Sequence, residues 1–298
     1  MSADPVQKTT QAASFTNGKR RGTQGHMVSH GIHWLTILIF IFPLYWLVVS
    51  SFKTLDSIFV VPFDWIPRTW TLDNYSEGWK YLGNVTFGRI FLNTFFVTIM
   101  TVLGTLLTST LVAFGFARIP FKGRNFWFLV LLATMMLPSQ VTLVPNYLIF
   151  DFLNLIDSFL VLYIGAFFGG GAFFIFLIRQ FIMGIPLDLD ESARVDGAST
   201  FRIYWQIILP LCGPVVATVV IFSFSWSYND FFTPLIYLNS IEKFTVPVAI
   251  RSFLDEAGAG NVGASLAMTV LSIVPLFVVF SLAQKYFVQG IMTTGLKG

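Results

Sequence analysis

The chain has very little of what soluble enzymes depend on. Cysteine occurs once, as Cys212, so no intrachain disulfide can form. Charged residues make up only 11% of the 298 residues, which is far below the share in soluble domains. The phosphate-loop pattern Gly-x-x-x-x-Gly-Lys-[Ser/Thr] is absent, so by this signature the chain does not bind ATP itself. These absences argue against a soluble protein and against an ATP-hydrolysing enzyme.

Candidate metal ligands and nucleophiles are also scarce. His26, His30 and His33 have spacings of four and three, which suit a metal on a helix, but no carboxylate or cysteine joins them. Cys212 lies inside a long apolar segment, where a single cysteine is usually a small packing residue. We therefore expect no catalytic residue, no metal site and no cofactor bound by this chain.

Long apolar segments dominate what is present. Hydrophobic residues form 55% of the chain, Phe occurs 34 times, and the mean hydropathy is +0.74. A transmembrane helix needs roughly 20 predominantly apolar residues. Six segments meet this requirement, at about residues 32–51, 90–114, 126–146, 158–179, 207–232 and 262–284. The sequence therefore predicts an all-α polytopic membrane protein with six transmembrane helices and both termini on one side.

The distribution of Lys and Arg predicts the orientation. Twelve of the 18 Lys and Arg residues lie in the tails and loops on the same side as the N-terminus. Positive charge collects on the cytoplasmic side, so both termini are expected there, and the basic pI of about 9.0 requires no nucleic-acid partner. The polar residues 1–30 are expected to be a disordered cytoplasmic tail, residues 31–298 the six-span domain, and about 285–298 a cytoplasmic C-terminal tail. The first apolar segment is too long for a signal peptide and should stay as an anchor.

A polar island interrupts the apolar segments between the fourth and fifth predicted spans. Pro186 suits the first turn of a short helix, and the acidic residues that follow favour a helix N-terminus. Gly197 then permits a sharp turn, and Ser199 or Thr200 can cap a second short helix. Residue types alone leave two interpretations open: a docking face for a soluble partner, or an ordinary amphipathic loop.

The spacing within the island favours the first interpretation. Glu191-x-Ala193, Gly197 and, after nine residues, Ile207-x-Leu209-Pro210 resemble the EAA signature of binding-protein-dependent ABC importer permeases, with Ser192 where the family usually has Ala. The resemblance covers about residues 30–298 and is to the carbohydrate (maltose/oligosaccharide-type) branch. Further matches are Leu72-Asp73-Asn74-Tyr75, Ala117-Arg118, Met136-Leu137-Pro138, Phe176 to Phe181 with Ile185-Pro186, Asp196-Gly197-Ala198, Asn229-Asp230, Phe287 to Gly290 and Lys297-Gly298. The tail pattern points to the second of the two permease subunits.

The resemblance implies a fold and a division of labour. The fold would be the type I ABC importer permease fold, with a cytoplasmic coupling helix in the loop at about 184–206. Glu191 would make a polar contact with a separate ATPase, Ser192 and Ala193 would allow close approach, and Gly197 would permit the turn. Asp196 belongs to the same motif. The tail would add contacts to the ATPase through Gly295, Leu296, Lys297 and Gly298.

The resemblance also implies partners and a location. These are a second homologous permease, a cytoplasmic ATPase dimer that binds ATP and Mg, an extracytoplasmic solute-binding protein, a sugar substrate and the surrounding lipid. The chain would lie in a bacterial or archaeal cell membrane. The outer loop at about 52–89 contains Trp65, Trp70, Trp79, Tyr75 and Tyr81, which suit either docking of the binding protein or an aromatic belt at the membrane interface.

Candidates for substrate contact lie at the outer ends of the third and fifth spans. Aromatic faces and amide or carboxylate groups suit a sugar. The candidates are Gln140, Asn146, Trp226, Tyr228, Asn229 and Asp230, with helix packing as the alternative role. Gly169-Gly170-Gly171 in the fourth span permits either close helix crossing or local unwinding, of which we expect crossing.

A different class of protein is the alternative to an importer subunit: a stand-alone secondary transporter or an intramembrane enzyme. Secondary transporters often have paired halves and buried ionisable residues. Here Asp230 is the only charged residue expected near membrane depth, and the two halves share no evident motif. A membrane enzyme needs a nucleophile or a metal cluster, and neither is visible. The sequence therefore favours a permease subunit without enzymatic activity of its own.

Overall fold

The computed structural model describes residues 22–62, 64–80, 84–255 and 261–295, and within these ranges it contains helices and no β-strand. The α-helices are α1 (Gly22–Ser51), α2 (Asp73–Lys80), α3 (Phe87–Arg118), α4 (Arg124–Thr134), α5 (Ser139–Phe152), α6 (Leu160–Phe167), α7 (Ala172–Met183), α8 (Asp188–Val195), α9 (Thr200–Ile203), α10 (Leu209–Leu211), α11 (Gly213–Tyr228), α12 (Phe232–Tyr237), α13 (Val246–Asp255) and α14 (Val262–Gly295). Short 3-10 turns cover Leu55–Ser57 and Ile241–Lys243, and a π-helical turn covers Tyr204–Ile208.

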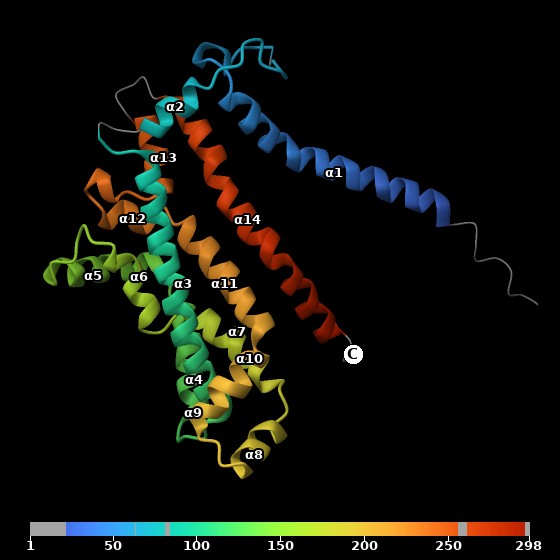
Figure 1. Cartoon of the computed structure of the whole chain (residues 1–298), viewed down its shortest axis with the longest axis vertical. Helices are drawn as coiled ribbons and strands as arrows, with labels where there is room; N and C mark the ends of the chain where they lie inside the picture. The colour runs from blue at the N-terminus through green and yellow to red at the C-terminus, as the bar shows by residue number, and fades with distance from the viewer. Residues whose placement is uncertain (1–21, 63, 81–83, 256–260, 296–298) are drawn as a thin grey trace, which may run out of the picture.

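The longest well-packed element, α3, runs the length of the molecule between two apolar clusters (Figure 1). At its N-terminal end, Phe87 and Ile90 pack with residues of α13 and α14. At its C-terminal end, Ala113 and Phe114 pack with α7, α8 and the segment that leads into α11. Because α3 belongs to both clusters, it connects the end of the molecule that carries α2 and α13 to the end that carries α8.

Four of the predicted spans are confirmed as helical segments long and apolar enough to cross a membrane: His30–Ser51, Phe87–Arg118, Leu160–Met183 and Val262–Leu282. The prediction of a continuous span at 126–146 is wrong, because α4 ends at Thr134 and α5 begins at Ser139. Pro138 explains the break, since it has no N–H to donate and it disfavours helical geometry at Leu137.

The fifth predicted span is bent. Residues Thr200–Leu211 and Gly213–Tyr228 meet at 77°. Pro210 and Pro214 flank the bend, and neither can donate the backbone hydrogen bond that a straight helix requires. Cys212 sits at this corner, 1% exposed and within the apolar cluster, which confirms its packing role.

The fourth span is interrupted between α6 and α7 by Gly169, Gly170 and Gly171, whose φ angles are 146°, 55° and 91°. These values lie in the region that favours glycine. A Cβ built on Gly170 would lie 2.2 Å from Ser109 Oγ and 2.5 Å from Thr108 Oγ1. The triplet therefore does both things considered from sequence: it unwinds the span and allows close approach to α3.

Both terminal helices reach into the segments predicted as tails. Helix α1 begins at Gly22 rather than after residue 30, and α14 continues to Gly295 through most of the expected tail at 285–298. No proline lies between Pro5 and Pro43 or after Pro275, so neither extension contains a proline that would interrupt it. Residues 1–21 and 296–298, which include Leu296, Lys297 and Gly298, lie outside the described residues.

Candidate functional site

The predicted helix–turn–helix of the polar island is confirmed. Helix α8 lies at one end of the molecule, and α2 and α13 lie near the other (Figure 1). Helix α8 begins at Asp188, directly after Leu187, so Pro186 lies just before the helix and not in its first turn. Asp188, Asp190 and Glu191 fall in that first turn. Gly197 has a φ of 79°, and the Ser199 side chain accepts a hydrogen bond from the Arg202 N–H, capping α9. The local sequence signals therefore determine this segment.

Residues of the EAA-like motif point in two directions. Glu191 and Ser192 are exposed, whereas Ala193 is 8% exposed and packs in the apolar cluster. Ser192 and Ala193 were expected to share one contact face. Ala193 instead lies on the helix face that packs against the body of the protein. Asp196 and Gly197 are exposed at the turn that follows.

Large exposed apolar side chains accompany Glu191 in this segment, which the sequence prediction missed: Leu187 and Val195 lie four residues before and after it, and Phe201 follows in α9. Leu187, Val195 and Phe201 are 57%, 88% and 67% exposed. In the sequence these residues could have been recognised as apolar residues inside an otherwise polar loop. Exposed apolar groups clustered at a charged residue are typical of a protein contact site.

A buried ion pair fixes α8 to α3. The Arg118 Nε lies 2.8 Å from Asp190 Oδ2, and both side chains are 4% exposed. The Arg118 Nη2 also donates a 2.7 Å hydrogen bond to the Ile185 carbonyl, just before α8. One guanidinium therefore holds both the entry to α8 and its first turn. Sequence reasoning noted both residues but did not pair them, because they are far apart in the chain.

The candidates for substrate contact are only partly brought together. Gln140 and Asn146 of α5 line a hollow of about 160 Å³ with Phe232, Thr233 and Tyr237 at α12. Asp230 adjoins it, since its Oδ1 accepts a 3.1 Å hydrogen bond from the Thr233 N–H. This hollow combines amide, hydroxyl and aromatic groups, which suit a polyhydroxylated ligand.

The remaining three candidates lie elsewhere. Tyr228 is 2% exposed and donates to the Ser272 carbonyl at 3.0 Å, so it joins α11 to α14. The Asn229 side-chain amide, at the C-cap of α11, donates to the Ser225 carbonyl of that helix. Trp226 packs against Phe173 and Phe174, with ring centroids 5.4 and 5.1 Å away. The packing alternative is thus the one observed for Tyr228.

A second ion pair joins two loops that are far apart in the sequence. The Asp157 carboxylate accepts hydrogen bonds from the Asn239 and Ser240 N–H groups at 2.9 and 3.0 Å, and it pairs with Lys243 Nζ at 2.8 Å. Burial alone would raise the pKa of Asp157, but the hydrogen bonds from Lys243, Ser240 and Asn239 outweigh burial and hold the pKa well below its usual value. This contact connects the α5–α6 turn to the segment before α13.

The aromatic residues of the segment between α1 and α3 have different environments. Trp65, Trp70 and Trp79 are 59%, 63% and 46% exposed, and Trp65 also contacts Tyr45 of α1. The Tyr75 hydroxyl lies 2.7 Å from the Ser51 Oγ. Tyr81 lies outside the described residues. Among the residues that are described, no group of three or more His, Cys, Asp or Glu side chains is placed to hold a metal ion.

Comparison with known proteins identifies a family and relatives of this chain. The family model described as "Binding-protein-dependent transport system inner membrane component" matches residues 105–293. The arabinooligosaccharides transport system permease protein AraQ of Bacillus subtilis (strain 168) is 33% identical over 263 residues, covering 88% of this chain and 92% of that protein. The sn-glycerol-3-phosphate transport system permease protein UgpE of Brucella abortus (strain 2308) is 31% identical over 274 residues, covering 90% and 96%.

The fold agrees with these relatives. A crystal structure of a bacterial ABC transporter involved in the import of the acidic polysaccharide alginate matches with a TM-score of 0.80 and 22% identity, covering 91% of this chain and 99% of the matched chain. The family match extends over more than half of the sequence, and the curated relatives are matched over most of their length. The chain is therefore a membrane protein of the binding-protein-dependent transport system inner membrane component family.

Proposed function

We propose that this chain is the second permease subunit of an ATP-driven sugar importer and that α8 is its coupling helix. The observation that carries the proposal is the exposed Glu191, surrounded by Leu187 and Val195 on a helix fixed to the membrane domain. The names of the relatives, which include arabinooligosaccharide and galactooligosaccharide permeases, support a sugar as cargo.

Coupling follows from the two faces of α8. Glu191 and Ser192 contact a separate cytoplasmic ATPase dimer, which binds ATP and Mg, while Ala193 and Asp190 hold α8 against this chain. Gly197 permits the turn, and Asp196 lies at its exposed side. When the ATPase dimer closes, its movement of α8 passes through Arg118 to α3. This arrangement requires no catalytic residue in the permease.

The remaining partners fit the surfaces away from α8. The second permease completes the membrane domain, and the extracytoplasmic solute-binding protein docks on the outer loop that carries Trp70 and Trp79. The termini are cytoplasmic in a bacterial or archaeal cell membrane. Six transmembrane segments result if the broken α4–α5 pair and the bent pair Thr200–Leu211 and Gly213–Tyr228 each count as one. The tail from Gly295 to Gly298 adds contacts to the ATPase.

The sugar pathway passes the hollow between α5 and α12. Gln140 and Asn146 supply amide groups there, and Asp230 orients Thr233. Specificity rests mainly with the binding protein, so these residues guide passage rather than select the sugar. A stand-alone secondary transporter is not supported, because the family to which the chain belongs works with a separate binding protein.

Charge reversal at Glu191 tests the coupling role. The full importer is purified from the source membranes with an affinity tag on this chain, and ATPase recovery, ATP hydrolysis and sugar uptake are measured together. Glu191→Lys is expected to detach the ATPase or to abolish uptake while hydrolysis continues. Glu242→Lys, an exposed substitution of the same charge in the segment before α13, is the matched control and should leave all three unchanged.

Two results would overturn the proposal. Full ATPase recovery and full uptake in Glu191→Lys would remove the coupling role of α8. Recovery of the tagged chain as an active transporter without any ATPase or second permease would favour a stand-alone carrier.

A further inference from the structure

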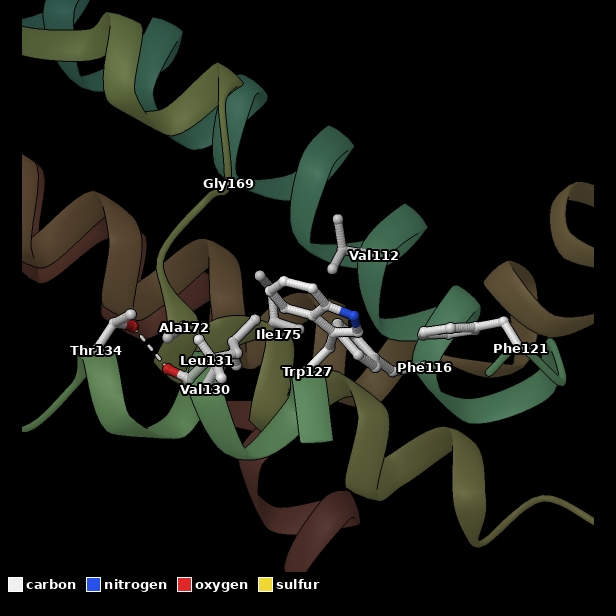
Figure 2. Close-up of a pocket in the computed structure, with 10 residues that line it drawn as sticks. All are labelled: Val112, Phe116, Phe121, Trp127, Val130, Leu131, Thr134, Gly169, Ala172 and Ile175. Atoms are coloured by element: carbon white, nitrogen blue, oxygen red, sulfur yellow. Dashed lines mark hydrogen bonds between the residues drawn. The ribbon is translucent and has the colours of Figure 1, made fainter. Parts of the chain in front are cut away.

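An apolar hollow of about 490 Å³ opens on the side of the molecule between α3, α4 and the α6–α7 break. Figure 2 shows the Trp127 indole lying across it, among side chains from these elements. Its lining is almost entirely hydrocarbon and aromatic: Val112, Phe116, Phe121, Trp127, Val130, Leu131, Thr134, Gly169, Ala172 and Ile175. The stretch of α4 from Trp127 to Thr134 gives this groove a length of about 10 Å.

A polar hollow of about 380 Å³ adjoins the apolar groove at the N-terminus of α4. Phe121 lines both, and Arg124 and Asn125 line the polar one. Gly123 occupies the cap position of α4 and offers no side chain to its first turn. A helix N-terminus favours negative charge. The combined site is therefore apolar along its length and electropositive at one end.

A buried arginine adds an independent reason to expect an anion. Arg179 is 9% exposed, its guanidinium lies 3.9 Å from the centroid of the Phe128 ring, and its Nε has no hydrogen-bond partner. Arg124, one turn before Phe128 on α4, lies close enough for its charge to repel that of Arg179. Neither arginine has a carboxylate partner among the described side chains. Arg179 lines neither hollow, but an anion at the N-terminus of α4 would be attracted by both guanidinium charges.

We propose that this groove binds one anionic phospholipid, with its phosphate at Arg124 and Arg179 and an acyl chain along Trp127 and Leu131. Guanidinium groups match phosphate geometry, and basic pockets between transmembrane helices at the cytoplasmic side bind anionic headgroups. A free phosphate would leave the apolar groove empty. A lipid fills both parts, and a protein of this family has lipid beside it.

Lipid retention on the purified full-length chain tests this proposal. The chain is stripped of lipid in mild detergent and titrated with phosphatidylglycerol or with phosphatidylcholine of the same acyl chains, and native mass spectrometry counts the adducts. Preferential retention of one phosphatidylglycerol is expected. Arg124→Gln should weaken that retention about fivefold, as should Arg179→Gln. Val130 is partly exposed at the rim of the groove, so Val130→Trp should narrow the groove and weaken the retention of both lipids.

Arg202→Gln is the matched control, because Arg202 is an exposed arginine on α9 whose guanidinium bonds only Gln206. It should retain phosphatidylglycerol as the unmodified chain does. Equal retention of the two lipids, or unchanged retention in both Arg124→Gln and Arg179→Gln, would overturn the site. Displacement of the lipid by millimolar inorganic phosphate would assign the arginines to a free anion. Protein–protein crosslinks from a photoreactive group at Val130 would assign the groove to a subunit interface.

Discussion

At the residue scale, the Arg118–Asp190 pair carries the most consequence for function. Both side chains are 4% exposed, so water stabilises neither charge if the other is removed. A surface pair of this kind contributes little to stability. Burial makes this pair a rigid connection between α8 and α3 instead.

Asp190→Asn is expected to destabilise the protein by about 3–5 kcal/mol, because it leaves the Arg118 charge buried and uncompensated. The thermal unfolding midpoint of the purified chain in detergent measures the loss. Asp188→Asn, on the exposed side of the same helix, should change stability by less than about 0.5 kcal/mol. The double variant Arg118→Met with Asp190→Leu should recover much of the lost stability. Equal unfolding midpoints for Asp190→Asn and Asp188→Asn would disprove the role of the pair.

Asp157 gives the contact between the α5–α6 turn and the segment before α13 a defined pH dependence. Its pKa is lower in the folded protein than in the unfolded chain, so its carboxylate contributes stability that is fully present above the unfolded value of about 3.9. That contribution is lost progressively as the pH falls below about 4. Asp157→Asn should lower the unfolding midpoint at pH 7 and flatten its decline under acid conditions. Asp151→Asn, exposed on α5, should keep the slope of the unmodified chain, and parallel slopes for both variants would contradict the assignment.

At the element scale, the broken helices distinguish this structure from six straight spans. Hydropathy predicted where apolar segments lie, and turn chemistry predicted α8, Gly197 and the Ser199 cap. Hydropathy does not report backbone angles, so the separation of α4 from α5 at Pro138 was missed. The pairing of Arg118 with Asp190 was also beyond reach, since it depends on how α3 and α8 pack. Sequence alone also could not show whether Tyr228 is buried in helix packing or lines the substrate pathway, since this depends on how α11 and α14 pack.

The α6–α7 break gives a prediction at the same scale. In Gly170→Ala the new Cβ would meet Ser109 and Thr108 side chains and the Thr105 carbonyl, at a positive φ. Overpacking and the left-handed backbone together should destabilise the protein by about 2–4 kcal/mol. Thermal unfolding of the purified chain measures this.

Gly165→Ala is the matched control for that substitution. Gly165 lies inside α6 with nothing within 4 Å of a built Cβ, so alanine should stabilise the helix by up to about 1 kcal/mol. Opposite shifts of the two variants are therefore expected. Destabilisation of similar size in both variants would mean that the close approach of Gly170 to α3 does not contribute to stability.

At the scale of the whole molecule, α1 extends away from the helical body and contacts α14 (Figure 1). Trp34, Leu38 and Phe40 on this helix are 66%, 63% and 73% exposed. An apolar helix in a membrane does not need protein to cover it, because lipid is equally apolar. The exposed length of α1 therefore leaves an elongated surface that either lipid or a protein partner can cover.

Photocrosslinking in native membranes distinguishes a protein partner from lipid at this surface. A benzophenone amino acid at Leu38 is expected to yield an adduct with a second, different polytopic chain, if the proposed second permease covers the exposed face of α1. The same group at Leu129 on α4, which is 65% exposed, is the matched control and should yield lipid adducts only. Lipid adducts alone at Leu38, in membranes that also contain the ATPase and the second permease, would place the subunit interface on another face. Because exposure is nearly equal at the two positions, a difference in adducts reports the partner and not the accessibility of the probe.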